Sequence, residues 1–141
     1  MSVMNLNARI GLSFDGQCEA VFKFYERCLN GKIAFMLRRG ESPMAKDAPA
    51  EWSEKIFHAT LVVGDTALLG ADALPGSYES PQGFSILLSP HVPEETERLF
   101  NALAENGTVR MSLQETFWAH RFGVVTDQFG IPWTINCEKS E

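Results

Sequence analysis

The sequence contains little cysteine and no long apolar run. Its three cysteines are widely spaced within 141 residues, and no CxxC pair is present. An odd number without such a pair argues against a disulfide framework and against a structural zinc site. No apolar stretch approaches the roughly 18 residues that cross a bilayer, and the first residues lack the pattern of a signal peptide. We therefore expect a cytoplasmic protein that does not enter a membrane.

An excess of positive charge is also missing. The formal net charge is −6 at pH 7, which would repel nucleic acid and anionic membranes alike. A glycine-rich GxGxG turn, which lets a cofactor approach the backbone, is absent too. The composition is ordinary for a globular protein, and the length is sufficient for one core. The sequence predicts a single domain over residues 1–141 that binds neither nucleic acid nor a membrane.

Hydrophobic periodicity predicts a strand and then a helix at the start of the chain. Apolar and polar residues alternate over residues 8–14, as in a strand with one buried face. Apolar residues recur at helical spacing over residues 19–29, and Asn30 and Gly31 follow, which can adopt the left-handed conformation that ends a helix. The other predicted elements of this half are strands at residues 32–39, 56–63 and 66–71.

The second half of the chain repeats this order. A strand at residues 84–88, a helix at 93–105 and a strand at 109–113 are predicted, and Asn106 and Gly107 end the second helix. The octapeptide HATLVVGD, residues 58–65, matches HRFGVVTD, residues 120–127, at the histidine, both valines and the aspartate. The agreement indicates an internal repeat.

One half contains an insertion between its helix and this matching strand. The segment from Gly31 to His58 is about twice as long as the equivalent segment from Gly107 to His120. The extra residues fall in a loop at 41–55, which is long enough to act as a lid.

Two copies of a β-α-β-β-β unit describe this pattern, which makes the expected fold class α+β. Module one would cover about residues 8–72 and module two about residues 83–137, with a linker rich in glycine, proline and serine between them. Two such modules can form a cup-shaped mixed sheet with helices outside, and its concave face is the expected ligand site.

Three segments carry a family resemblance: FDGQCEAVFKFY, IFHATLVVGDTALLGAD and ETFWAHRFGVVTDQFGIPWTIN. They resemble the PhnB-like branch of the vicinal oxygen chelate superfamily, which also contains glyoxalase I, bleomycin resistance proteins and extradiol dioxygenases. The resemblance covers residues 8–136. It implies paired β-α-β-β-β modules, a cup-shaped cavity and a homodimer.

The metal ligands of that superfamily have no counterpart in the sequence. Metal-dependent members carry ligands on the first strand of each module and a carboxylate on each last strand, because a divalent ion needs several converging ligands. The first-strand positions here are Arg9, Ile10 or Gly11 and Phe84 or Ser85. The predicted strand 66–71 has no carboxylate, and Thr134 occupies the corresponding position of module two. We therefore expect no metal and no other cofactor.

His58 and His120 occupy equivalent positions of the two repeats and could face each other across the cup. A neutral imidazole can bind a ligand or transfer a proton near pH 7; two structural histidines are the simpler alternative. Alternation along a strand places His120 and Phe122 on one face, with Trp118 just before them. Core packing is an equal alternative for Trp118. The ligand-binding candidates are His58, Gln114, Thr116, Trp118, His120, Phe122, Thr134 and Asn136, and no catalytic residue is identified.

The segment that follows these aromatics predicts a turn and a last strand. In DQFG, residues 127–130, Gly130 can supply the positive φ of a tight turn that begins at Asp127. In the strand after it, Trp133 and Ile135 should face the helices, which leaves the two polar candidates of that strand toward the cavity.

The sequence supports several functions. The first is a homodimeric, metal-free protein of the PhnB-like, glyoxalase/bleomycin-resistance fold that binds a small molecule, with the reaction unassigned. One alternative is a lyase or dioxygenase with a divalent metal in a displaced site made by His58 and His120. Another is a resistance protein that sequesters a drug. Relatives of this branch are often labelled methyltransferases, but that function is the weakest candidate because the glycine-rich turn is missing.

Overall fold

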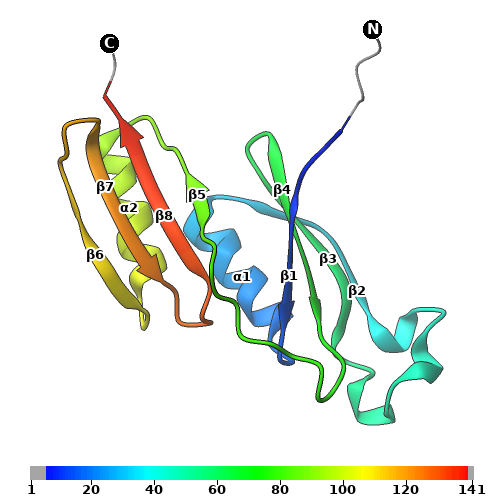
Figure 1. Ribbon diagram of the computed structural model, residues 1–141. Helices are drawn as coiled ribbons and strands as arrows, with labels where there is room; N and C mark the ends of the chain where they lie inside the picture. The colour runs from blue at the N-terminus through cyan, green and yellow to red at the C-terminus, as the bar shows by residue number, and fades with distance from the viewer. Residues whose placement is uncertain (1–5, 140–141) are drawn as a thin grey trace, which may run out of the picture. The chain divides into compact units, whose positions relative to one another are not determined.

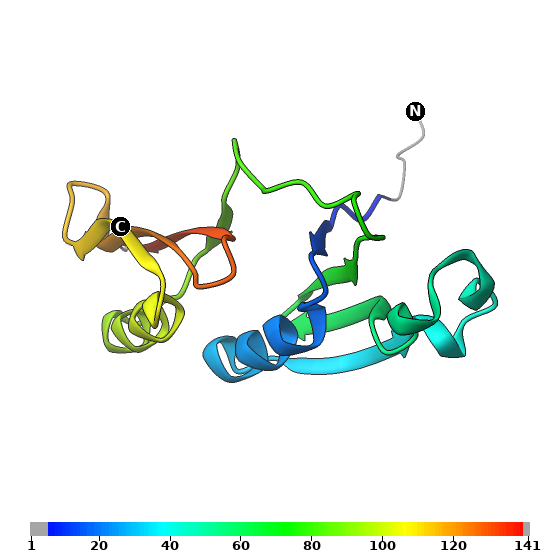
Figure 2. The same ribbon diagram turned by 90° about the horizontal axis from the view of Figure 1, so that it is seen from below.

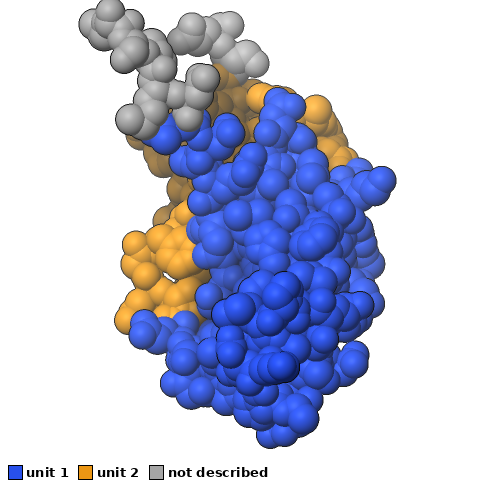
Figure 3. All heavy atoms as spheres, turned by 90° about the vertical axis from the view of Figure 1, so that its right-hand side faces the viewer, with its two compact units in different colours: residues 1–79 blue, residues 80–141 orange. Residues whose placement is uncertain are grey.

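The computed structural model describes residues 6–139, and the chain divides into two compact units, residues 1–79 and 80–141 (Figure 3). Each unit contains one sheet and one α-helix. None of the helices in residues 6–139 is long and apolar enough to cross a membrane. That the two units make one domain stays a prediction.

The first unit is a β-α-β-β-β module (Figure 1). Its strands pair in the order β1-β4-β3-β2, with β1 parallel to β4 and the other pairs antiparallel. We call this sheet A. Its elements are β1 (Ile10–Phe14), α1 (Cys18–Leu29), β2 (Lys32–Arg38), β3 (Ile56–Val63) and β4 (Thr66–Asp72), with three 3₁₀ turns between β2 and β3 at Arg39–Glu41, Ala45–Asp47 and Ala50–Trp52.

The second unit has the same element order and the same topology. Its strands pair in the order β5-β8-β7-β6, with β5 parallel to β8, and we call this sheet B. Its elements are β5 (Ile86–Leu88), α2 (Pro93–Ala104), β6 (Thr108–Gln114), β7 (Ala119–Thr126) and β8 (Pro132–Glu138). The predicted α+β class and the predicted pair of β-α-β-β-β modules are confirmed, and most element bounds lie close to those expected.

In each unit the helix covers one face of the sheet (Figure 2). On α1, the side chains buried toward sheet A include Val21, Phe22 and Tyr25. On α2, Leu99, Phe100 and Leu103 are buried in the same way. These side chains recur every three or four positions, which is the spacing of one helix face. Within residues 6–139, no α-helix of the same unit covers the opposite face of either sheet, and we call that face the open face.

Both helices end close to the predicted positions: Asn30, with a φ of 55°, follows α1 directly, whereas α2 ends at Ala104 and Asn106, with a φ of 58°, comes two residues later. The start of α1 lies within one residue of the predicted start, but the side chain that accepts its first backbone N–H was not predicted. The backbone N–H of Cys18 donates to the Asp72 carboxylate at 2.9 Å, and the N–H of Ile56 donates to the other oxygen at 2.8 Å. Strand β4 extends to Asp72, just beyond the predicted strand. This corrects the expectation that the last strand of module one has no carboxylate, because Asp72 is part of it.

The connection between β2 and β3 confirms the predicted insertion. It spans residues 39–55, whereas the equivalent connection between β6 and β7 spans only residues 115–118. Three 3₁₀ turns give this insertion local structure. Its role as a lid stays a prediction.

The three cysteines are free and buried, as small apolar side chains usually are. Burial, and then the negative charges of Asp72 and Glu19, raise the pKa of the Cys18 thiol far above its ordinary value. The thiolate is the reactive form of cysteine, and these surroundings disfavour it.

The DQFG segment forms the predicted turn. The Asp127 carboxylate accepts the backbone N–H groups of Phe129 and Ile131 at 2.8 and 3.1 Å through one oxygen. Its other oxygen accepts the indole N–H of Trp133 at 2.8 Å. Gly130 has a φ of 88°, and Asp127 is only 3% exposed. This turn thus fixes the start of β8 and orients its buried tryptophan.

Replacing Asp127 by alanine should destabilise the protein by about 3 kcal/mol, because the buried indole and two backbone N–H groups lose their acceptor. Urea unfolding measures this loss. The control is D65A at the equivalent position of the first repeat, where the aspartate is exposed in a turn. It should change the free energy of unfolding by less than about 0.5 kcal/mol. Equal effects of the two substitutions would contradict the role assigned to Asp127.

Candidate functional site

The open face of sheet A carries His58. Residues directly opposite each other in an antiparallel pair point to the same face. Leu37 lies opposite His58, and Phe35 lies opposite Thr60. The intervening Ala59 is fully buried on the side of α1. His58 and Phe35 therefore share the open face, where their rings lie 5.9 Å apart.

The His58 ring is half-buried, and within residues 6–139 its contact with Phe35 is the interaction that positions it. Phe35 itself is 48% exposed. An imidazole beside an exposed aromatic ring is accessible to a ligand, as a binding role for His58 requires. That role stays a prediction.

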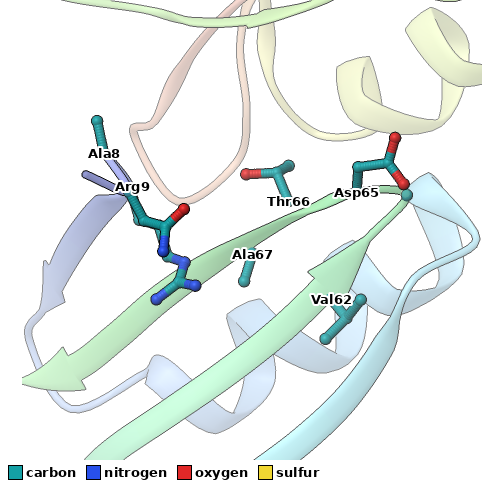
Figure 4. A pocket seen from close by; sticks show the side chains of 8 residues that line it. Ala8, Arg9, Val62, Asp65, Thr66 and Ala67 are labelled. Carbon is teal, nitrogen blue, oxygen red and sulfur yellow. The ribbon is translucent and has the colours of Figure 1, made fainter. Parts of the chain in front are cut away.

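A pocket of about 420 Å³ lies at the β3–β4 turn end of sheet A. Arg9 and Asp65 provide charged groups on opposite sides of it, while Val62 and Ala67 line its floor (Figure 4). Val62 pairs with Ala67 across the sheet. The pocket therefore forms a polar, solvent-accessible end of the open face of sheet A.

At the other end of sheet A, two consecutive arginines lie where β2 ends and the insertion begins. Arg38 donates two hydrogen bonds to the Glu19 carboxylate on α1, at 3.1 and 2.9 Å. The Arg39 guanidinium carbon lies 5.1 Å over the centre of the Phe57 ring, and Arg39 is buried. A cation–π contact contributes about 0.5–2 kcal/mol, whereas removing a charge from water costs several kcal/mol. Phe57 alone does not compensate for the burial of Arg39.

The open face of sheet B carries an aromatic–amide cluster, formed by Phe117, Trp118, Phe122 and Asn136. Phe122 lies opposite Asn136 on β8. The Trp118 ring packs edge-on against Phe122, with ring centres 5.2 Å apart, and its indole N–H donates to the Asn136 side-chain oxygen at 3.1 Å. Phe117 packs on Trp118 at 4.8 Å and is almost fully exposed.

Asn136 holds this cluster in place. Its side chain is almost fully buried and its amide nitrogen donates to Glu138 at 3.3 Å, so both ends of the amide are hydrogen-bonded. Trp118 remains 40% exposed although its orientation is fixed. The indole is therefore a preorganised, accessible surface.

The structure brings several candidates of the second module onto one face. Gln114 lies opposite Phe122, and Thr134 lies opposite Val124. The Thr134 hydroxyl shares a 2.8 Å hydrogen bond with Ser85. Trp133 and Ile135, on the other side of β8, are fully buried as predicted.

Two candidates have different surroundings. The Thr116 hydroxyl accepts the backbone N–H of Ala119 at 3.0 Å, which stabilises the turn between β6 and β7. His120 lies where the pairing of β7 with β8 shifts between Ala119 and Arg121. Alternation from Phe122 does not apply across such an irregularity. The roles of Thr116 and His120 in binding stay predictions, as does a pairing of His120 with His58.

Sequence reasoning missed Phe117 and Arg39. Phe117 is adjacent to the predicted Trp118, and its exposure was not evident from strand alternation because it precedes β7. Arg39 is an arginine between a strand and a loop, and arginines are mostly exposed in folded proteins. Its burial depends on contacts with Phe57 and with the insertion, which no local pattern signals.

The residues at the superfamily metal positions do not fit a divalent ion. Within residues 6–139, no group of three or more His, Cys, Asp or Glu side chains is arranged to hold a metal. Arg9, at a first-strand position, is a cation, and both Asp72 oxygens accept backbone N–H groups. Ser85 and Thr134 are hydrogen-bonded to each other. None of these four side chains presents a free carboxylate oxygen.

Comparison with known proteins assigns the family. The model of the 3-demethylubiquinone-9 3-methyltransferase family matches residues 7–136. The chain belongs to this family. Protein YjdN of Escherichia coli K12 is 37% identical over 138 residues, which cover 92% of this chain and 94% of that protein.

Solved structures agree with the assignment. Protein PA1353 from Pseudomonas aeruginosa is 46% identical, with a TM-score of 0.87 and coverage of 96% of this chain and 100% of that one. A Bacillus cereus PhnB protein, described as a putative 3-demethylubiquinone-9 3-methyltransferase, is 19% identical over 94% of this chain and 99% of its own, with a TM-score of 0.78. A glyoxylase/bleomycin resistance protein/dioxygenase domain from Frankia, 12% identical over 97% of this chain and 100% of its own, has a TM-score of 0.66. The PhnB-like and vicinal oxygen chelate resemblance is thus confirmed, and the last two likenesses show the fold.

The ion pair between Arg38 and Glu19 should make the stability of the protein depend on pH. Hydrogen bonds from Arg38, and then from Lys23, lower the pKa of Glu19 from 4.5 to about 2. Ionised Glu19 therefore stabilises the fold above pH 4.5, and this stabilisation is lost as the pH falls toward 2. Both side chains of the Arg38–Glu19 pair are about a third exposed, so solvent screening reduces the effect to about 1 kcal/mol.

Urea unfolding at a series of pH values tests this expectation. The variant E19Q should lose about 1 kcal/mol less stability than the wild type over this acid range. The variant E95Q, which removes an exposed ion pair within α2, should keep most of the wild-type pH dependence. An unchanged pH dependence in E19Q would contradict the contribution of the Arg38–Glu19 pair.

Proposed function

We propose that this protein binds a small, flat, mostly apolar molecule with a polar edge on the open faces of its sheets. The aromatic–amide cluster of sheet B is the observation that carries the proposal. Trp118 is hydrogen-bonded through its indole to Asn136 and packed against Phe122, yet it stays accessible. Fixed aromatic rings next to a few polar groups are typical of small-molecule sites.

The apolar character of the open faces supports the same function. Large apolar side chains are exposed on both, including Phe35 and Val62 on sheet A and Leu87 and Met111 on sheet B. Contiguous exposed apolar surface marks sites of interaction. We propose a cytoplasmic homodimer that uses these faces for its ligand.

The name of the family does not extend the proposal to methyl transfer. A glycine-rich turn for a methyl-donor cofactor is absent from the sequence, and the observations on sheet B indicate binding of a planar molecule rather than a particular reaction. A fosfomycin resistance protein from Listeria monocytogenes, 11% identical over 98% of this chain and 96% of its own, shares the fold with a TM-score of 0.63. The fold is therefore also present in a resistance protein.

Nuclear magnetic resonance of the indole N–H groups tests the binding surface. The chain has three tryptophans, so three indole signals are expected. Planar bicyclic fragments with one carbonyl edge, such as quinolinones, should shift the Trp118 signal. The Trp133 signal should not move, because that indole is fully buried and bonded to Asp127. The variant W118F identifies the signal and should weaken binding about tenfold, since it removes ring area and the indole hydrogen bond.

A matched control is W52F, which removes a tryptophan of the insertion in the other unit. It should bind the fragments with wild-type affinity. If no fragment of this kind shifts the Trp118 signal, or if W118F binds as well as the wild type, the proposed binding surface is wrong.

Removal of metal should change nothing. We expect dialysis against EDTA to leave the midpoint of thermal unfolding and the affinity for fragments unchanged, because the donors at the superfamily positions do not fit a divalent ion. Native mass spectrometry of the untreated protein measures both bound metal and the expected dimer. A stoichiometric transition metal whose removal abolishes binding would instead support the displaced site of His58 and His120.

A further inference from the structure

Arg39 is a buried cation without a charged partner among residues 6–139. Only 8% of its surface is exposed, and its Nε atom is buried with no hydrogen-bond partner. None of the ion pairs within residues 6–139 includes Arg39. Its guanidinium instead lies over the face of Phe57. A buried guanidinium normally faces a carboxylate or another anion, because the protein otherwise bears the cost of removing it from water.

The neighbouring arginine has the opposite environment. Arg38 is more exposed than Arg39, yet the nearby acidic side chains contact Arg38. Its guanidinium binds Glu19 and lies 3.8 Å from Glu54, and its backbone N–H donates to Glu41 at 3.2 Å. These carboxylates are therefore directed toward Arg38 and leave Arg39 without compensation.

The backbone of Arg39 is held from both ends of the insertion. Its N–H donates to the Lys55 carbonyl at 2.8 Å, and its carbonyl accepts the backbone N–H and hydroxyl of Ser42 at 3.1 and 2.8 Å. The N–H of Gly40 donates to the Ser53 carbonyl at 2.9 Å. The burial of the guanidinium is thus a feature of an ordered segment.

Arg39 lies where β2 ends and the insertion begins, at the end of sheet A opposite the β3–β4 turn. Arg38 pairs with Ile56, which is buried, and its guanidinium reaches α1 on the covered side of the sheet. The guanidinium of Arg39 packs instead on Phe57, the neighbour of His58 on β3. Phe57 and Val62, which lines the pocket at the far end, are separated along β3 by roughly 17 Å. The arginine and the pocket therefore mark opposite ends of sheet A.

We infer that Arg39 is an anion-binding site that takes a carboxylate or phosphate group of a small molecule. A guanidinium donates parallel hydrogen bonds to two oxygens of such a group, and apolar surroundings strengthen them. The small exposed area of Arg39 admits a compact oxyanion more easily than a side chain attached to a second protein. This site is in the first unit and does not depend on the aromatic–amide cluster of the second.

The Nε–H signal of Arg39 in nitrogen-15 spectra reports on the site directly. Inorganic phosphate is the probe, with sodium chloride at equal ionic strength as the reference. Phosphate should shift the Arg39 signal, raise the midpoint of thermal unfolding by several degrees, and leave the Trp118 indole signal in place. The stabilisation follows because a ligand that binds only the folded state shifts the equilibrium toward it.

Replacing Arg39 by methionine separates a binding role from a structural one. The variant R39M should unfold at the same or a higher temperature than the wild type without phosphate, because it removes an uncompensated buried charge. Its affinity for phosphate should fall roughly 10- to 100-fold. The variant R39K keeps the charge but cannot form the bidentate hydrogen bonds of a guanidinium. It should bind phosphate with intermediate affinity.

The matched control is R27M. Arg27 also lies over an aromatic ring, with its guanidinium carbon 6.0 Å from the centre of Phe24, but on the outer surface of α1. This variant should keep the full response to phosphate. A response that is equal in R39M and R27M would overturn the proposal.

Two further outcomes would also overturn it. A lower unfolding temperature of R39M without phosphate, together with no phosphate effect on the wild type, would show that Arg39 is structural. Dissociation of a dimer in R39M would show that a second copy supplies the anion. Failure of the planar fragments to bind, with a normal phosphate response, would reject the proposed function alone.

Discussion

Two buried carboxylates determine how each module closes. Asp72 accepts N–H groups from the start of α1 and the start of β3, so it joins three elements of the first unit. Asp127 accepts N–H groups from its own turn and the indole of Trp133, so it fixes β8 in the second. A buried carboxylate is tolerated only when its oxygens are hydrogen-bonded, and the donors are equally costly to leave unpaired. The sheets and their open faces depend on these contacts.

In each sheet, one face packs against a helix and stabilises the unit, while the other face stays accessible. One face buries a helix, and Gly123 shows how closely: a Cβ at this position of β7 would lie 2.7 Å from the Phe100 ring. The other face keeps aromatic and polar side chains accessible, in fixed orientations on a rigid support. Such preorganisation reduces the conformational entropy that a ligand must overcome. Binding on the open faces is therefore compatible with a well-packed core.

The two modules differ most where ligand chemistry is proposed. The first has the long insertion that begins at Arg39, whereas the second has a short connection that carries Phe117 and Trp118 at the corresponding place. The same topology thus supports a buried cation on one sheet and an aromatic cluster on the other. The equivalent aspartates diverge in the same way, since Asp65 is an exposed turn residue and Asp127 is buried.

The sequence by itself determined the two modules, the element order, the insertion and the family, because periodicity and turn residues such as Asn30 and Gly130 are local signals. Through strand alternation it also placed Phe122 on one face with His120, and Asn136 toward the expected cavity. Only the tertiary structure decided the rest. Asp72 reaches Cys18 from the far end of the module, a strand irregularity interrupts alternation at His120, and the insertion buries Arg39 without an acid. These properties depend on which distant groups meet, and no local pattern encodes that.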